Sequence, residues 1–229
     1  MIRLALREEQ VAGETAVLDA GQVHYLTVVM RQRPGAELIA VLPDGARLAR
    51  LEDGFRIALL DVVPLVPAAR PSITLAQALL KGDHWADCVN LGTQVGVADF
   101  LPLVTRRTVV REARPDRLRR WRDVAREAAE QCGRADIPEV REPIALAQLA
   151  DTPHVVVLSP AGESLPDVYT TLGRPDHVTL VVGPEGGLDP SEEHLLEAAG
   201  ARRATLGPRI LRAENAGALA AFFLIHAHN

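Results

Sequence analysis

The sequence predicts an α/β protein in which a parallel-sheet domain follows a small β domain. From Ser72 onward, apolar runs rich in β-branched residues alternate with helical patterns, which is typical of a mostly parallel sheet. Before residue 64 the apolar runs are short and broken by turn residues, as in a small barrel. Three prolines between Val63 and Pro71 indicate a semi-rigid linker. We therefore expect one domain over residues 1–70 and another over residues 71–229.

The first domain is predicted to be built around a hairpin. Asp44-Gly45 is a strong turn signal between the apolar runs 37–42 and 46–51. A short helix is expected near residues 24–31, and a further strand over residues 55–63. The sequence pattern predicts no binding site here.

The second domain is predicted to alternate strands and helices. Pro115 at a first turn and Gly133 just past a last turn bracket one long helix. Ser191, followed by acidic residues, is expected to cap another. The expected strands cover residues 73–80, 100–105, 154–159, 177–182 and 204–206, and the other helices cover residues 84–94 and 213–226.

Composition favours a soluble, reduced, intracellular protein. Hydrophobic residues make up 48% and charged residues 24% of the 229 residues, as in globular proteins, and the net charge is −5. Cys88 and Cys132 lack the spacing of metal ligands, so we expect no metal and a cytoplasmic location. Neither a signal peptide nor a membrane span is predicted.

Two Gly-Pro corners near the C-terminal end are the strongest functional feature. Gly183-Pro184 ends an apolar strand, and Gly207-Pro208 ends another, each before a helical pattern. One such corner is usually ordinary turn chemistry. Two close together, carrying many polar residues, predict a small-molecule site held by backbone groups. Those polar residues are Glu185, Arg209, Arg212, Glu214 and Asn215.

The segment 106–126 holds nine arginines against three acidic residues. Two interpretations of these arginines remain open. They form either a patch for phosphate contacts or a solvated helix face, in a chain whose basic residues are nearly all arginine. Trp121 within it is expected to anchor the core rather than stack on a base.

The corners belong to a longer joint pattern. The run Gly183-Pro-Glu-Gly-Gly187, about twenty residues, and then Leu206-Gly-Pro-Arg-Ile-Leu-Arg-Ala-Glu214 resembles the RsmE family of 16S rRNA uridine-N3 methyltransferases, of the SPOUT class. Further matching motifs, in order, are Ala78–Asp83, Thr93–Val97 and Glu127–Arg134. The chain departs from the family at Leu91, Gln94, Cys132, Ala213 and Asn215.

The resemblance implies a fold and an activity. The expected fold is a PUA-like RNA-binding β-barrel followed by a SPOUT-type α/β methyltransferase domain with a C-terminal trefoil knot. The expected activity is transfer of a methyl group from S-adenosylmethionine to N3 of a uridine in 16S rRNA, or in the small ribosomal subunit. The implied assembly is a homodimer, for which the largely apolar helix after Ala213 supplies a face.

The resemblance and the corners together predict the site residues. Arg134, Arg212 and Glu214 are the expected catalytic residues: Glu214 as proton acceptor, the arginines holding negative charge. Arg134 as a helix cap, and an Arg212–Glu214 pair with no catalytic part, are the alternatives. The expected cofactor-binding residues are Leu158, Pro160, Gly162, Val182, Gly183, Pro184, Glu185, Gly186, Gly187, Leu206, Gly207, Ile210 and Leu211.

Two other functions are weighed against methyl transfer. One is a non-catalytic RNA-binding protein that retains the pocket, which Ala213 and Asn215 permit. The other is a regulatory domain that binds a nucleotide without preferring S-adenosylmethionine. Methyl transfer to a matching RNA separates the first from an enzyme, and ligand preference separates the second.

Overall fold

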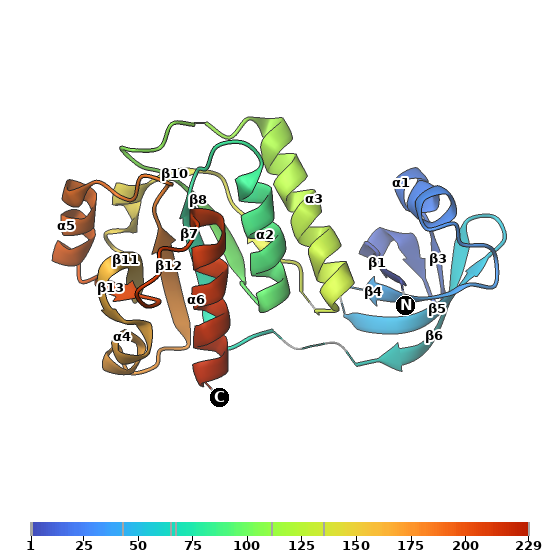
Figure 1. Cartoon of the computed structure of the whole chain (residues 1–229). Helices are drawn as coiled ribbons and strands as arrows, with labels where there is room; N and C mark the ends of the chain where they lie inside the picture. The colour runs from blue at the N-terminus through green and yellow to red at the C-terminus, as the bar shows by residue number, and fades with distance from the viewer. Residues whose placement is uncertain are drawn as a thin grey trace. The chain divides into compact units, whose positions relative to one another are not determined.

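The computed structural model describes residues 2–42, 44–64, 66, 68–110, 112–134 and 136–228. The chain divides into two compact units, Met1–Pro67 with Ala129–Asp136, and Ala68–Ala128 with Ile137–Asn229 (Figure 1). Residues 129–136 thus belong with the first unit, although the sequence assigned them to the second. Two hydrogen bonds tie this segment to β1: Arg3 donates to the Gly133 carbonyl, and the Ala5 amide donates to the Glu130 carboxylate.

The first unit is a six-stranded sheet around its own core. Its strand order is β1-β4-β5-β6-β3-β2, with β1 parallel to β4 and the other neighbours antiparallel. Leu42 pairs with Gly45 at the tip of the predicted hairpin. Leu26 and Ile57 are fully buried in the core. The elements are β1 Ile2–Ala5, η1 Glu8–Gln10, β2 Val11–Ala12, β3 Thr15–Val17, α1 Ala20–His24, η2 Tyr25–Val29, β4 Glu37–Leu42, β5 Gly45–Glu52 and β6 Arg56–Val63.

The second unit is a seven-stranded, wholly parallel sheet. Its order is β10-β8-β7-β12-β11-β13, with β9 beside β8. The strands are β7 Ser72–Ala78, β8 Asp99–Val104, β9 Glu139–Val140, β10 Ile144–Ala145, β11 Val155–Ser164, β12 His177–Val182 and β13 Arg202–Thr205. The pairing of β7 with β12 brings the end of an early strand beside the first Gly-Pro corner.

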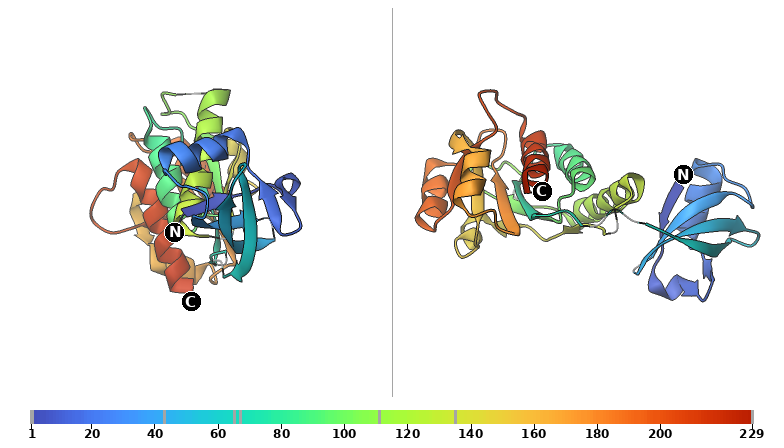
Figure 2. Two further views of the ribbon diagram at one scale, coloured as in Figure 1. Left: turned by 90° about the vertical axis from the view of Figure 1, so that its right-hand side faces the viewer. Right: turned by 90° about the horizontal axis from the view of Figure 1, so that it is seen from below.

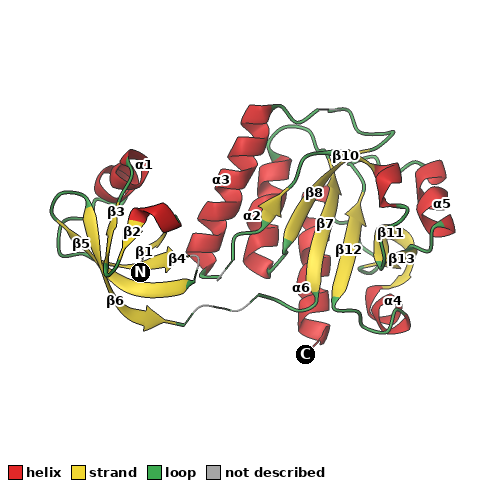
Figure 3. Ribbon diagram, turned by 180° about the vertical axis from the view of Figure 1, so that it is seen from behind, coloured by secondary structure: helices red, strands yellow, loops and turns green. Residues whose placement is uncertain are grey.

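Helices cover both faces of this sheet, because its strands are apolar on both sides. Ile73 and Leu75 of β7 pack toward the face covered by α2, α3, α4 and α6, whereas Ala76 packs toward η3 and α5. Figure 3 shows the sheet in front of α2 and α6, and Figure 2 shows these two helices side by side. The helices are α2 His84–Val95, α3 Pro115–Cys132, η3 Leu146–Leu149, α4 Leu165–Thr171, α5 Pro190–Ala198 and α6 Ala213–His228.

The cap of α5 differs from the expectation. Asp189, not Ser191, is its N-cap: the Asp189 carboxylate accepts from the Ser191 amide at 3.0 Å, and Pro190 occupies the first turn. Glu192 closes a capping box by accepting from the Asp189 amide at 3.1 Å. The hydrogen bonds from Ser191 and the charges of nearby arginines hold the pKa of Asp189 below its ordinary value.

Most arginines of the 106–126 segment pair with neighbouring groups. Arg120 binds Asp83 through both terminal nitrogens, and Arg117 donates to the Gly82 carbonyl at 2.7 Å. Arg107, Arg119, Arg122 and Arg126 also have acidic partners, and Arg111 lies outside the described residues. Trp121 is 2% exposed and stacks on Trp85 at 4.4 Å, which confirms its core role. The geometry of α3 therefore favours the structural reading of this segment.

Candidate active site

A cavity of about 560 Å³ opens where the second unit's central strands end. It lies at the C-terminal ends of β11, β12 and β13 and is closed by the start of α6. Ligands bind at this edge of open parallel sheets because the strand-to-helix loops converge there. Its volume is in the range of small-molecule sites.

The cavity gathers most of the predicted residues. Of the predicted cofactor-binding residues, those that line it are Leu158, Pro160, Val182, Gly183, Pro184, Glu185, Gly187, Leu206, Gly207, Ile210 and Leu211. Arg212 and Glu214 line it as well. Gly162 and Gly186 are not among its lining residues. A Cβ on Gly162 would stand 2.6 Å from the Ala204 backbone, so this glycine permits β13 to approach β11.

The first corner, residues 183–187, is held from several sides. A Cβ on Gly183 would lie 2.8 Å from the Leu188 nitrogen, so no larger residue fits without moving the backbone. The buried Gln77 amide donates to the Gly183 carbonyl at 3.4 Å. Arg107 donates to the Gly186 carbonyl at 3.0 Å and pairs with Asp189 at 3.6 Å. These contacts fix backbone groups in advance of a ligand.

The second corner, residues 205–212, is a loop that leads into α6. Gly207 has φ 113°, a left-handed value that favours glycine. Its amide donates a hydrogen bond to Thr205 Oγ1 at 3.2 Å. Ile210 is 88% exposed although it lines the cavity. An apolar side chain this open at a cavity wall is suited to contact a ligand.

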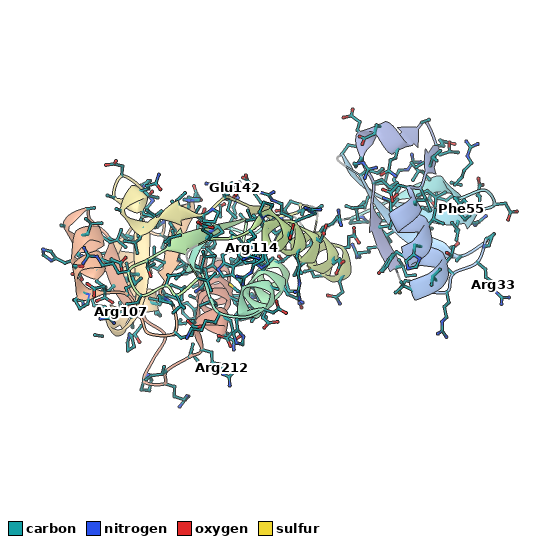
Figure 4. All side chains as sticks on the ribbon, turned by 90° about the horizontal axis from the view of Figure 1, so that it is seen from above. Arg33, Phe55, Arg107, Arg114, Glu142 and Arg212 are labelled. Atoms are coloured by element: carbon teal, nitrogen blue, oxygen red, sulfur yellow. The ribbon has the colours of Figure 1, made fainter. Side chains whose placement is uncertain are left out.

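Three ionisable groups meet at the α6 end of the cavity. Glu214 is 9% exposed and lies in the first turn of α6, where the helix dipole favours a negative charge. Its Oε1 lies 3.7 Å from Arg212 Nη1 and 3.8 Å from His84 Nδ1. In Figure 4, Arg212 lies where the loop joins α6. The predicted Arg212–Glu214 pair is therefore present, with most of Arg212 open to solvent.

Sequence reasoning missed His84 and several other lining residues. His84 is far from Glu214 along the chain, and the two meet only because α2 packs beside α6. The motif before His84 gave a nearby signal, since Lys81–Asp83 lies just ahead of it. Arg209, one of the polar residues expected at the second corner, lines the cavity as predicted, and the other lining residues outside the predicted set are Ser159, Leu188, Glu193, Ala204, Thr205, Ala213 and Ala216.

Arg134 belongs to the first unit, whereas the cavity belongs to the second. It is 7% exposed, and its guanidinium binds both carboxylate oxygens of Asp136, at 3.1 and 2.6 Å. Its catalytic role stays a prediction.

Residues 68–225 match the model of the RNA methyltransferase domain family. The chain is 37% identical over 227 residues to the ribosomal RNA small subunit methyltransferase E of Mycobacterium bovis, covering 91% of this chain and 85% of that protein. The chain belongs to the ribosomal RNA small subunit methyltransferase E family.

Two solved structures extend the family likeness to the whole fold. A methyltransferase from Legionella pneumophila, with S-adenosylmethionine bound, has a TM-score of 0.88 at 30% identity and covers 99% of this chain and 97% of its own. The family member from Neisseria gonorrhoeae, also bound to S-adenosylmethionine, has a TM-score of 0.85 at 29% identity, covering 96% and 95%. The predicted fold, an α/β methyltransferase domain that follows a small β domain in the chain, is confirmed.

The described residues contain neither a membrane-spanning helix nor a cluster of metal ligands. None of the described helices is long and apolar enough to cross a membrane. No group of three or more histidine, cysteine, aspartate or glutamate side chains is placed to hold a metal ion in the described parts of the chain.

Proposed function

We propose that this protein transfers a methyl group from S-adenosylmethionine to N3 of a uridine in 16S rRNA, in the cytoplasm. The observation that carries the proposal is the cavity formed jointly by both Gly-Pro corners, in a chain of this family. It combines apolar walls, exposed backbone groups and an ionisable end. Relatives with the same fold hold S-adenosylmethionine.

The cavity's wall suits that cofactor. Leu158, Leu206 and Ile210 offer apolar contacts for an adenine ring, and the glycines at the corners let a ligand approach the backbone. The cofactor supplies an electrophilic methyl group. The chain's part is to align the target nitrogen and remove its proton, because a protonated imide nitrogen is a poor nucleophile.

The α6 end of the cavity suits the second task. Glu214 accepts the N3 proton, and Arg212 stabilises the negative charge that spreads over the base oxygens. Bringing the base to this point requires it to leave its stack in the RNA.

The decisive experiment combines binding and turnover. S-adenosylmethionine and S-adenosylhomocysteine should each raise the melting temperature, by about 2.7 kcal/mol of stability at a hundredfold excess over Kd. Incubation with small subunits lacking the modification should yield 3-methyluridine at one position by mass mapping. Cofactor binding without methylation of rRNA or subunits would instead support the non-catalytic RNA-binding function.

The first unit, in this proposal, places the RNA and does not bind the cofactor. Its support is a solvent-exposed segment, residues 28–33, in which Val28 and Val29 stand beside Arg31 and Arg33. Figure 4 shows Arg33 on this unit. Apolar and arginine side chains together suit bases and phosphates.

A homodimer through α6 is also proposed. Leu219, Phe222 and Phe223 are 43%, 48% and 39% exposed and share one face of α6, because they are spaced by three and four residues. Exposed aromatic side chains of this kind favour burial against a second copy. We further propose that the C-terminal segment forms a trefoil knot, which the chain trace of an experimental structure would test.

A further inference from the structure

His84 is a titratable side chain of the cavity wall that the assigned roles leave unused. It is the first residue of α2, and its side chain is 46% exposed. The preceding turn is held by Arg117 on the Gly82 carbonyl and by Arg120 on Asp83. The position of the imidazole is therefore set by a tethered turn and not by a free loop.

Four groups on the elements around His84 bear on its charge. Nδ1 lies 3.8 Å from Glu214 Oε1 on α6 and 3.6 Å from Asp87 Oδ2 on α2. Arg212 Nη1 lies 3.7 Å from the same Glu214 oxygen. The Cys88 thiol is neutral, since burial and then the charges of Glu214 and Asp87 raise its pKa to about 12.

Glu214 alone is poorly suited to dispose of a proton. Its side chain is only 11% exposed, so water has little access to it. Carboxylic acids ordinarily have a pKa near 4.3 and imidazoles near 6.5, so a proton on a carboxylate moves favourably to an adjacent imidazole. The side chain of His84 is 46% exposed, against 11% for Glu214, so the imidazole can release the proton to solvent.

We propose that His84 is a relay residue that carries the uridine N3 proton from Glu214 to water, an inference that rests on the proposed function. The N3–H bond breaks and its proton passes to the Glu214 carboxylate. N3 gains the methyl group as the S–CH₃ bond breaks, leaving S-adenosylhomocysteine. Glu214 then gives the proton to neutral His84, which releases it to water, so charge and atoms balance.

The distance between His84 and Glu214 is compatible with proton transfer once substrate is bound. A separation of 3.8 Å is longer than a hydrogen bond, but catalytic hydrogen bonds are often long before substrate binds and shorten in the complex. Glu214 stays at the cavity when no base is present because it lies in the first turn of α6, which closes the cavity.

The test compares His84→Ala with the parent at pH 8, on small-subunit substrate. His84→Ala should run roughly a hundredfold slower, the lower end for general acid–base catalysis. Added imidazole should restore much of its rate. His194→Ala, on an exposed part of α5, is the matched control and should behave as the parent.

The outcomes distinguish failure of the His84 relay from failure of the proposed methyl transfer. A parent protein that binds S-adenosylmethionine but never methylates the RNA would defeat the proposed function itself. An active parent whose His84→Ala variant keeps the parent's rate would overturn the relay alone. So would a slow His84→Ala variant that imidazole does not rescue, since His84 would then only support the start of α2. Melting shifts with S-adenosylmethionine should be equal in all variants.

Discussion

The nearly buried carboxylate of Glu214 lies within 4 Å of two basic side chains, those of Arg212 and His84. Arg212 is largely solvent-exposed, and exposed ion pairs contribute little to stability, so this pair is poorly explained as a structural device. A cation held loosely at a cavity edge can instead move onto a substrate anion.

Arg212→Ala and Glu214→Gln should each slow methyl transfer by about a hundredfold or more, since loss of one group that stabilises developing charge typically costs about 3 kcal/mol. The melting shift with S-adenosylmethionine should stay at the parent value. Glu127→Gln, on the exposed face of α3, is the control. Parent rates in both variants would refute these roles, and loss of cofactor binding would make the two residues part of the cofactor site.

The two cysteines should differ sharply in thiol labelling at pH 8. Cys88 is fully buried and its pKa is raised to about 12, so it stays a neutral thiol well above pH 8. Only the thiolate reacts quickly, and Cys132 is partly exposed. Mass spectrometry of the folded protein should therefore find the label on Cys132 first, with Cys88 labelled after unfolding. Equal labelling of both in the folded protein would contradict the burial of Cys88.

The loop before α3 contacts the first corner, residues 183–187, through the side chain of Arg107. Arg107 reaches both the Gly186 carbonyl and the cap residue of α5, so one side chain ties three segments together. The arginine-rich segment thereby supports the cavity, a role distinct from phosphate binding.

Arg107→Ala should weaken S-adenosylmethionine binding roughly three- to tenfold, because the corner loses a hydrogen bond with a net contribution of about 0.5–1.5 kcal/mol. Isothermal calorimetry measures the change. Arg126→Ala removes an arginine that pairs with Asp123 on α3 and should leave the affinity unaltered. An unchanged Kd in Arg107→Ala would show that the first corner keeps its conformation without the Arg107 hydrogen bond.

The exposed face of α6 carries the dimer proposal. Phe222→Asp should convert the protein to a monomer, because an unpaired charge in a buried interface is strongly unfavourable. Light scattering at micromolar concentration gives the mass. Leu195→Asp, an exposed apolar position on α5, should leave the dimer intact. A monomeric parent would refute the interface.

Across the whole molecule, the two units divide the proposed work, RNA placement in the first and the cavity in the second. A fragment that begins at Pro71 would test this poorly, because residues 129–136 pack with the first unit and would lose Arg3 and Ala5 as partners. Substitutions in the full chain avoid that problem.

Arg31→Glu with Arg33→Glu should weaken rRNA binding and lower the slope of log K against log salt by about 1.4–1.8, as expected for two lost phosphate contacts. The melting shift with S-adenosylmethionine should not change. Arg50→Glu is the control, since Arg50 lies on β5 of the same unit and pairs with Glu37. Unaltered RNA affinity in the double variant would exclude residues 28–33 as the contact.

The sequence by itself determined the alternation of strands and helices, the two corners and the family, because these depend on local period, turn chemistry and short motifs. It placed α3 to the residue, since Pro115 and Gly133 mark its ends directly. It misplaced the α5 cap by two residues and ended the strand β11 at Ser159, whereas β11 pairs with β13 again at Glu163 and Ser164 after a register shift. Only the tertiary structure decided that His84 meets Glu214, because their approach depends on α2 packing against α6. It also decided that three arginines of α3, Arg117, Arg120 and Arg122, are paired, because their partners lie 20 or more residues away in the chain.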